Sequence, residues 1–409
     1  MTKTKISIHW QILIALCLSV LFGYYLKDYV PYVSWMGDIF LRSLKMIVIP
    51  LVLTSVASGI AKLGETDGFK RLGLKTLLYY LTTSIFAILG GLFFSNILKP
   101  GVGFTPTETS SSEVTSSLTS ANSTSIKDTL IHIVPDNIFS SFYHSELLSI
   151  IFFAIVIGIF IPKLKKRDSE MLIGILEASF ELFMKITMFI IKLAPYGIFG
   201  LISKVVAEQE DMSGMLSSLG IFMVSVLSAL FVHFVIVIPL MVRFIGKANP
   251  IKHFDNMSTA LLTAFSTASS AAALPLTMEA THEESGVSKK ITNFTLPVGA
   301  TVNMDGTAIY ICAVVMFIAQ LKGVDLSFYQ QFVILISALL TSIGTAAIPM
   351  GSLVVITIIL DLLNLPIEMV AVVLPVDRLL DMFRTATNVW SDSCGAVIVA
   401  KTEGETLHV

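Results

Sequence analysis

Long apolar runs alternate with short polar or basic segments along most of the chain. Runs of about 20 residues can cross roughly 30 Å of hydrocarbon as helices. Such runs predict membrane spans at residues 8–26, 36–60, 75–98, 147–161, 171–205 and 214–244. Pro50 is expected to kink the second span, and the Ser- and Thr-rich residues 101–125 predict an exposed loop within the connector 101–146.

The chain changes character after residue 244. Segments 253–290 and 328–362 are apolar but are interrupted by small polar residues, S-T-A-S-S-A-A-A from Ser266 and S-I-G-T-A-A-I-P-M-G-S from Ser342. A membrane tolerates such interruptions only where the irregular backbone lines a cavity or is buried in protein. We therefore predict two helical hairpins that enter the membrane and turn back, a pattern typical of transporters built from repeats.

A further span, 291–320, lies between these hairpins and contains N-M-D-G-T from Asn303 to Thr307. Asp305 beside Gly306 predicts local unwinding of this helix, which would free backbone carbonyl oxygens next to a carboxylate. Hard cations prefer oxygen atoms of both kinds. The segment is thus a candidate cation site.

The last apolar segment, 366–401, carries D-R-L-L-D-M-F-R-T-A-T-N-V-W-S-D from 377 to 392. At about 100° per residue, several of its polar residues fall within roughly 80° of one helical face. They are Asp377, Asp381, Arg384, Asn388 and Asp392. Since a charge at the bilayer centre costs about 2.5–3.5 kcal/mol, this stripe predicts a binding site. The alternative is the outer face of a soluble amphipathic helix.

Composition decides between these alternatives. Of the 409 residues, 54% are hydrophobic and only 14% are charged, which is typical of a polytopic membrane protein. A net charge of −2 without a basic patch argues against nucleic acid as a partner. Cys17, Cys312 and Cys394 lie in apolar runs without metal-ligand spacing, so we interpret them as small buried residues.

Basic residues indicate the orientation of the chain in the membrane. If the N-terminus, with Lys3 and Lys5, is cytoplasmic, the loops after the second, fourth and sixth spans should be basic as well. These loops contain Lys62, Lys70, Arg71 and Lys75, then Lys163, Lys165, Lys166 and Arg167, then Arg243, Lys247 and Lys252. The opposite loop, around residues 208–211, is acidic. We predict a multi-pass protein of the cell membrane with both termini in the cytoplasm.

Taken together, N-M-D-G-T, the two interrupted segments and D-R-x-x-D-x-x-R-T-x-x-N-V resemble the glutamate transporter family of sodium- or proton-dependent acidic amino-acid and dicarboxylate symporters. The resemblance covers essentially the whole chain. It implies an all-α polytopic membrane protein with eight transmembrane helices plus two re-entrant helical hairpins, inverted repeats and a homotrimeric assembly. It also implies an elevator mechanism, in which a transport domain (75–100 and 214–409) slides against a trimerisation scaffold (1–70 and 147–205).

The resemblance assigns an acidic amino acid, of the aspartate or glutamate type, to the polar stripe of 366–401. Arg384 would grip the side-chain carboxylate of the substrate, Asp377 would hold the guanidinium, and Asp381 would take the α-ammonium group. The other members of this pocket would be Thr385, Asn388, Thr307, Ser270 and Ile348. From the residues alone, the alternative for Arg384 with either aspartate is an ion pair that joins helices, and the alternative for the hydroxyls is hydrogen bonds to their own helices.

Sodium is the coupling ion that the resemblance implies. A first site would use Asp392 with carbonyls of Gly299, Asn303 and Asn388; a second Thr83, Ser84, Asn303, Asp305 and the carbonyl of Tyr80; a third the carbonyls of Thr301, Ser342, Ile343 and Thr345. Asp392 favours sodium, because proton-coupled relatives tend to carry a neutral side chain there. A proton-coupled dicarboxylate carrier or a neutral amino-acid carrier is the alternative within this fold.

Some positions depart from the family pattern. Ala268 and Met382 stand where family members often carry a further arginine, which makes the pocket less positive. Ala347, Met350 and Ser352 replace the usual glycine-rich tip of the second hairpin, and Trp390 and Ser391 replace smaller residues before Asp392. No mechanistic meaning follows from Trp390 or Ser391 in the sequence alone.

Rival classes of protein receive less support. A channel would repeat polar residues along several helices, whereas here they concentrate in one helix and two hairpins. An enzyme would need a nucleophile with a base or a metal cluster, and the histidines lie outside the motifs, so we expect no enzymatic activity. His233, in the sixth span, is interpreted as a satisfied packing residue, with a role in proton coupling as the alternative.

Overall fold

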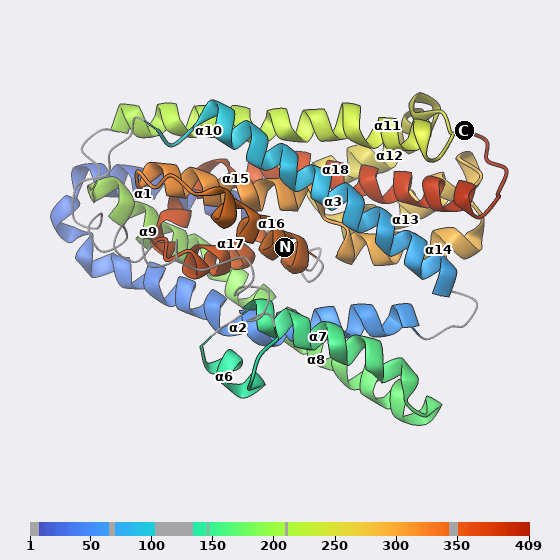
Figure 1. Cartoon of the computed structure of the whole chain (residues 1–409). Coiled ribbons are helices and arrows are strands. Elements are labelled where there is room, and N and C mark those ends of the chain that lie inside the picture. Colours follow the sequence, from blue (N-terminus) through green and yellow to red (C-terminus); the bar gives the residue numbers. More distant parts are fainter. Residues whose placement is uncertain (1–7, 65–69, 103–133, 145–146, 209–211, 343–350) are drawn as a thin grey trace, which may run out of the picture.

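The computed structural model describes residues 8–64, 70–102, 134–144, 147–208, 212–342 and 351–409 (Figure 1). Within these ranges all regular structure is helical and no strand is found, as expected for an all-α protein. By length and apolar composition, three of the described helical runs are able to cross a membrane: Arg71–Leu98, Ser213–Phe244 and Lys289–Leu321. The expected number of spans therefore stays a prediction.

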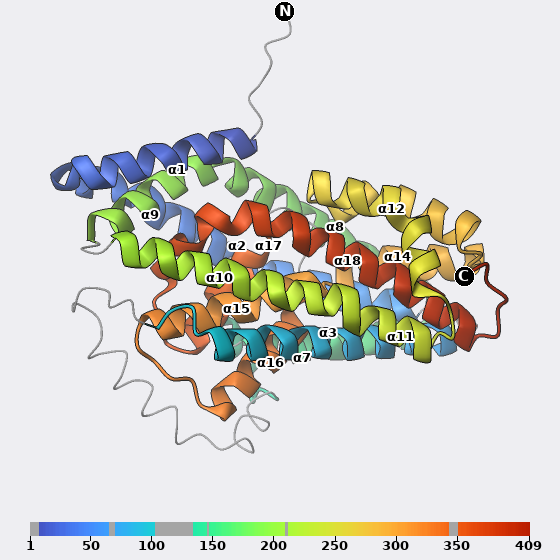
Figure 2. The same cartoon turned by 90° about the horizontal axis from the view of Figure 1, so that it is seen from above.

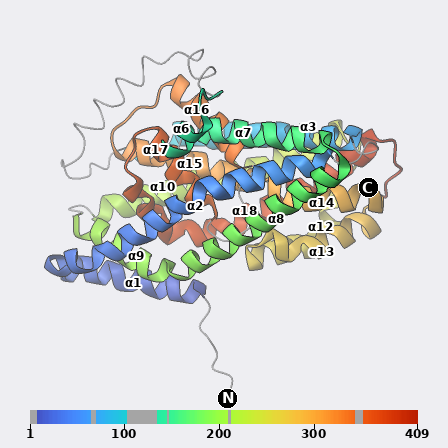
Figure 3. The same cartoon turned by 90° about the horizontal axis from the view of Figure 1, so that it is seen from below.

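One group of helices comes from the first half of the chain. It consists of α1 (Ile8–Tyr25), α2 (Pro31–Gly64), α7 (Leu147–Phe160), α8 (Lys166–Lys192) and α9 (Ala194–Glu208). Helix α2 is its centre, because it contacts α7, α8 and α9, while α1 lies along α9 (Figure 3). A short helix, α6 (Ile138–Tyr143), contacts α7 from the connector.

The fifth predicted span differs from the structure. Residues 171–205 were expected to form one continuous helix, but α8 ends at Lys192 and α9 begins at Ala194. Pro195 explains the break: it has no N–H to donate to the preceding turn, and it is well tolerated only in the first turn of a new helix. Pro50, by contrast, lies inside α2 without ending it.

The second group surrounds the last helix of the chain. It consists of α3 (Lys70–Leu98), α10 (Met212–Val232), α11 (Ile238–Phe244), α12 (Pro250–Thr267), α13 (Ser270–Glu279), α14 (Lys289–Val302), α15 (Asp305–Leu321), α16 (Phe328–Ser342), α17 (Gly351–Leu362) and α18 (Leu374–Thr402). Helix α18 lies between α10 and α12 (Figure 2) and also contacts α3, α14 and α15. Its position makes it the element on which most of this group converges.

Short helical turns of other kinds complete the chain. They are 3-10 turns at Lys27–Tyr29, Ile161–Lys163 and Ile367–Val373, and π-helical turns at His233–Val237 and Ala280–Glu284. The turn at His233 is continuous with α10 and α11, where Pro239 cannot donate to the usual carbonyl. Such π turns frequently occur at functional sites.

Two of the predicted interruptions are visible in the structure. Helices α12 and α13 contact each other and are joined at Ala268, which has a left-handed backbone (φ 46°), and Ser269, whose side chain caps α13. Helices α14 and α15 are separated by Asn303 and Met304, whose backbone angles are not helical. Where the second hairpin is predicted, α16 contacts α17, and the connecting residues 343–350 lie outside the described part of the chain.

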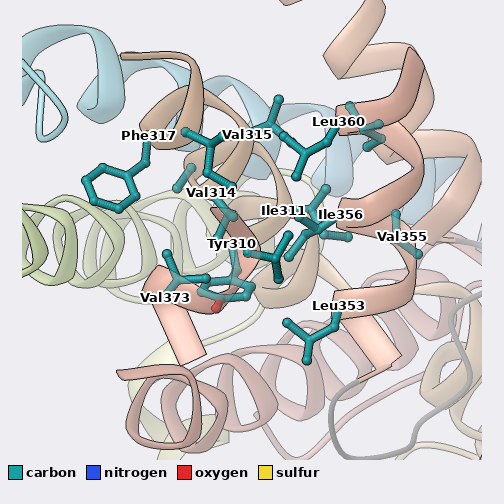
Figure 4. Close-up of a cluster of buried hydrophobic side chains, with 14 of the residues drawn as sticks. Tyr310, Ile311, Val314, Val315, Phe317, Leu353, Val355, Ile356, Leu360 and Val373 are labelled. Carbon is teal, nitrogen blue, oxygen red and sulfur yellow. The ribbon is translucent and has the colours of Figure 1, made fainter. Parts of the chain in front are cut away.

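Helix α15 forms the core of the second group. Every residue from Asp305 to Ala319 is buried, and aliphatic side chains of α17 pack on one of its faces (Figure 4). Leu353 and Ile356 of α17 lie near Tyr310 and Ile311 of α15 in this cluster. The tight packing fixes the start of α15, where the polar residues of N-M-D-G-T meet α18.

Candidate functional site: two polar clusters at the last helix

Arg384 of α18 is the centre of a first polar group, which we call the arginine cluster (Asp377, Asp381 and Arg384). Its Nη2 atom lies 3.0 Å from Asp377 Oδ1 and 2.8 Å from Asp381 Oδ1, and Nη1 donates to Ser352 Oγ at 3.2 Å. The Arg384 side chain is only 1% exposed. The ring of Tyr310 lies beneath the guanidinium, 3.9 Å from ring centroid to Cζ. Ion pairs and a cation–π contact therefore hold this arginine in one orientation.

Glycine allows α15 to approach α18 beside this cluster. A Cβ atom on Gly306 would lie 2.8 Å from Arg384 Cα, so no larger residue fits without movement. The Gly306 N–H donates to Asn388 Oδ1 at 2.8 Å, and Asn388 Nδ2 donates to Thr307 Oγ1 at 3.3 Å. Asn388 thereby joins the unwound start of α15 to the polar stripe of α18.

Asp305 is the centre of a second polar group, the carboxylate cluster (Asp305, Asp392, Asn303 and Ser391). Its side chain is fully buried and accepts hydrogen bonds from Thr83 (2.7 Å), Ser84 (2.7 Å) and Ser391 (2.6 Å). His233 Nε2 lies 3.0 Å from Asp305 Oδ2. Helices α3 and α18 and the π-helical turn that begins at His233 thus all supply partners to one carboxylate.

Asn303 connects Asp305 to Asp392. Its Nδ2 atom donates to Ser391 Oγ at 3.0 Å and to Asp392 Oδ1 at 2.9 Å. Its Oδ1 atom is buried and has no hydrogen-bond partner among the described residues. A Cβ atom on Gly299 would lie 2.6 Å from Asp392 Oδ1, so this glycine leaves room for the carboxylate. Carboxylate, amide and hydroxyl oxygens gathered in this way are ligands that suit a hard cation.

Comparison with known proteins identifies the family. The model of the sodium:dicarboxylate symporter family matches residues 8–402. The chain belongs to this family. A proton/sodium-glutamate symport protein of Geobacillus stearothermophilus is 36% identical, over 98% of this chain and 96% of the relative. A proton/glutamate-aspartate symporter of Escherichia coli (strain K12) is 33% identical, over 98% and 94%. Excitatory amino acid transporter 3 of Oryctolagus cuniculus is 33% identical, over 100% and 88%.

In this sodium:dicarboxylate symporter family member, several predicted site residues lie together. Asp377 and Asp381 contact Arg384, Thr83 and Ser84 contact Asp305, and Asp392 contacts Asn303 and adjoins Gly299. Thr385 is buried beside Arg384 on α18, and Ser270 is buried in the first turn of α13. These contacts establish proximity; the functional roles of the residues stay predictions.

Within the described residues, the side chains of Thr301 and Tyr80 form no hydrogen bond to either cluster. The Thr301 hydroxyl donates to Val298 O of its own helix at 3.0 Å, and the Tyr80 hydroxyl donates to Thr295 O at 2.8 Å. Both residues were predicted to act through their carbonyls, which these contacts do not test. Ile343, Thr345 and Ile348, and the side chain of Ser342, lie outside the described residues.

Sequence reasoning missed one member of the two clusters, Ser391, and several residues that contact them. His233 was interpreted as a satisfied packing residue, but its Nε2 contacts Asp305 and its buried Nδ1 has no partner within the described ranges, so that interpretation is wrong. Ser391 had no assigned role, although it follows the polar stripe at about 20° from its edge on a helical wheel. Ser352 and Tyr310 carry no signal of their own, because only the folded arrangement of α15 and α17 brings them to Arg384.

Proposed function

We propose that this protein is a secondary active symporter that imports an acidic amino acid together with sodium ions across the cell membrane. The observation that carries the proposal is the pairing of the buried Arg384 with Asp377 and Asp381 on α18, together with a second cluster that contains the buried carboxylates of Asp392 on the same helix and Asp305 on α15. The relatives are named for glutamate, aspartate, sodium and protons, which supports an acidic amino acid and a coupling cation.

The arginine cluster offers partners for each charged group of such a substrate. Arg384 binds the side-chain carboxylate, for which a planar guanidinium has two parallel donors. Asp381, whose side chain is 15% exposed, binds the α-ammonium group, while the more buried Asp377 keeps Arg384 in place. The remaining members of the pocket are Thr385, Asn388, Thr307, Ser270 and Ile348.

The carboxylate cluster offers oxygen ligands to sodium. One proposed site consists of Asp305, Thr83, Ser84, Asn303 and the Tyr80 carbonyl, and another of Asp392 with carbonyls of Gly299, Asn303 and Asn388. A third uses carbonyls of Thr301, Ser342, Ile343 and Thr345. Two buried carboxylates close together are costly unless a cation or hydrogen bonds compensate them, which favours cation binding at this place.

Substrate movement is proposed to follow the elevator mechanism in a homotrimer. The two groups of helices support this, because most contacts of each helix fall within its own group, with smaller contacts such as α2 with α17 and α7 with α16 between the groups. The first group would be the scaffold (1–70 and 147–205) and the second the transport domain (75–100 and 214–409).

Contacts between basic residues and the C-terminal segment support the proposal that both termini lie on the cytoplasmic side. Arg71 and Lys75 contact Glu403, and Lys252 Nζ donates to His408 O at 2.6 Å. Three of the basic residues that predict a cytoplasmic location after the second and sixth spans therefore contact the C-terminal segment, as expected if both termini are cytoplasmic.

Uptake into liposomes that contain the purified protein tests the proposed function, with sodium and pH gradients imposed separately. We expect labelled aspartate or glutamate to accumulate with an inward sodium gradient and without a pH gradient. Uptake that is driven equally well by a proton gradient in sodium-free buffer would support the proton-coupled alternative instead. Preferential uptake of serine or succinate would refute the choice of an acidic amino acid.

A further inference from the structure

Ser391 lies between the two buried carboxylates of the carboxylate cluster. Its Oγ atom donates to Asp305 Oδ2 at 2.6 Å and accepts from Asn303 Nδ2 at 3.0 Å. The same amide nitrogen donates to Asp392 Oδ1 at 2.9 Å. The residue is fully buried, so its hydroxyl has no competing hydrogen bonds to water. Ser391 is thus a member of the proposed cation site by geometry, although its position in the motif suggested no role.

The hydroxyl proton of Ser391 and a cation would compensate the same oxygen atom. Asp305 Oδ2 receives hydrogen bonds from Thr83 and Ser391 and contacts His233, while Ser84 donates to Oδ1. Hydrogen bonds to an ionised acceptor in a buried site are strong and stabilise the carboxylate on their own. The more complete this stabilisation is, the less free energy a cation gains by binding to Asp305.

Asn303 provides a second, independent sign that a cation belongs here. Its Oδ1 atom is fully buried and unpartnered among the described residues, and buried acceptors of this kind normally have a partner. A hard cation at this oxygen would satisfy it. The amide keeps its orientation even without Ser391, because Nδ2 also donates to Asp392. Removing the Ser391 hydroxyl should therefore affect mainly Asp305.

We propose that Ser391 sets the sodium affinity of the Asp305 site, by donating its hydroxyl proton to the carboxylate oxygen that the cation must share. The inference rests on the proposed sodium coupling. Ser391 is a positioning residue that weakens cation binding and stabilises the cation-free protein. Loss of one charged hydrogen bond from the cation-free form predicts a sodium affinity higher by on the order of tenfold.

Sodium titration of the purified full-length protein tests this inference. Sodium chloride replaces choline chloride at constant ionic strength, and binding is followed by the fluorescence of Trp390 in a Trp10→Phe, Trp35→Phe background. Trp390 adjoins Ser391 and is fixed by a hydrogen bond to Phe234 O at 3.1 Å. We expect Ser391→Ala to bind sodium about tenfold more tightly, whereas Ser391→Thr, which keeps the hydroxyl, retains the parent affinity.

Thermal unfolding of the same variants separates this role from a merely structural one. Ser391→Ala should melt at a lower temperature than the parent in choline and approach it at saturating sodium, because ligand binding restores what the lost hydrogen bond supplied. Ser393→Ala is the matched control: this buried serine of the same helix donates to Trp390 O and should leave sodium affinity unchanged.

Three results of these titrations would contradict either the role given to Ser391 or the sodium coupling on which it rests. Weaker sodium binding by Ser391→Ala would make the hydroxyl oxygen a cation ligand and overturn the inference. An unchanged affinity, with the same loss of melting temperature at all sodium concentrations, would reduce Ser391 to a packing residue. Absence of sodium binding by the parent protein would instead refute the proposed sodium coupling itself.

Discussion

The two polar clusters that α18 forms with its neighbours compensate buried charge in different ways. In the arginine cluster, Arg384 lies between Asp377 and Asp381, and Arg378, just outside the cluster, approaches Asp381 at 3.4 Å, so the two acids face two bases. In the carboxylate cluster, the donors to Asp305 and Asp392 within the described residues are hydroxyls, an amide and the His233 ring.

This difference indicates what each cluster is able to bind. In the arginine cluster, the arginine and the aspartates can release one another and bind the carboxylate and ammonium groups of an amino acid instead. The site then gains no net charge, because the two groups of the substrate have opposite charges. A pair of carboxylates with mainly neutral donors gains most from a cation, because burial of net charge is costly. We therefore expect substitutions in the first cluster to change which substrate binds, and substitutions in the second to change cation dependence.

The largest expected effect is that of Arg384→Thr. This change removes the proposed partner of the substrate carboxylate and leaves Asp377 and Asp381 without their main cation, at a cost of about 3–5 kcal/mol for an acidic amino acid. Serine or alanine should lose much less affinity and become better substrates than aspartate. Binding of aspartate and serine to both proteins, measured by calorimetry in sodium, checks this.

Arg378→Thr is the matched control for Arg384. Arg378 belongs to the same helix but is 34% exposed, so its loss should weaken aspartate binding much less. Unchanged aspartate affinity in Arg384→Thr would mean that the buried arginine is a structural ion-pair residue, and the contrast between the clusters would fail.

Asp305→Asn tests the other side of the comparison. It keeps the size of the side chain but removes a charge from the carboxylate cluster. Sodium affinity should fall by roughly 10–100-fold, because the charge of the ligands and the residues that hold them set the affinity of a metal site. Sodium dependence of aspartate uptake and sodium-induced thermal stabilisation are the measurements. Asp255→Asn, an exposed carboxylate of α12, should change neither. Equal sodium dependence in both variants would exclude Asp305 from the cation site.

The polar stripe of α18 and the unwound start of α15 were predictable, because local patterns encode them. Asp377, Asp381 and Arg384 repeat at helical spacing, and Asp305 beside Gly306 marks the observed break at Asn303 and Met304. Membership of the family also followed from these motifs. In both regions the pattern lies within a short stretch of sequence, even though some of the contacts that it leads to, such as Gly306 with Asn388, join two distant motifs.

The partners supplied by distant helices were not predictable in the same way. His233 reaches Asp305 from a π-helical turn 72 positions away, and Ser352 reaches Arg384 from α17. Such contacts depend on how helices pack, which a periodic pattern does not specify. The break between α8 and α9, by contrast, has a local signal in Pro195, although the long apolar run around this residue predicts a single span.

Asp381→Asn should alter selectivity within the arginine cluster. The wild-type protein is expected to bind succinate poorly, because succinate leaves Asp381 without an ammonium partner. Asparagine removes that penalty and also weakens the hold on the amino acid, so the preference for aspartate over succinate should fall by about tenfold or more. Competition of both compounds against labelled aspartate measures the ratio. Asp325→Asn, an exposed carboxylate between α15 and α16, should preserve it. Wild-type protein that binds succinate as well as aspartate would refute the role given to Asp381.

The smallest effect is expected at the exposed end of the same helix, where Glu403 forms a surface counterpart to the buried ion pairs of Arg384. Hydrogen bonding from Lys75, with the nearby charge of Arg71, holds the pKa of Glu403 below its ordinary value. Glu403 is 26% exposed and Arg71 is 71% exposed, so solvent screens the pair and Glu403→Gln should destabilise the protein by only about 0.3–1 kcal/mol. Because the folded-state pKa is depressed, this contribution is present above the unfolded-state pKa and is lost as the pH falls through the folded-state value. Chemical unfolding in detergent at neutral pH, and again below the pKa of Glu403, should therefore show a difference in stability between wild type and variant only at neutral pH.

Glu170→Gln is the control, because its partner Lys166 lies 3.9 Å away on the exposed surface of α8, and this variant should show almost no loss of stability at either pH. A loss as large as that for Arg384→Thr would mean that burial does not distinguish the two ends of α18.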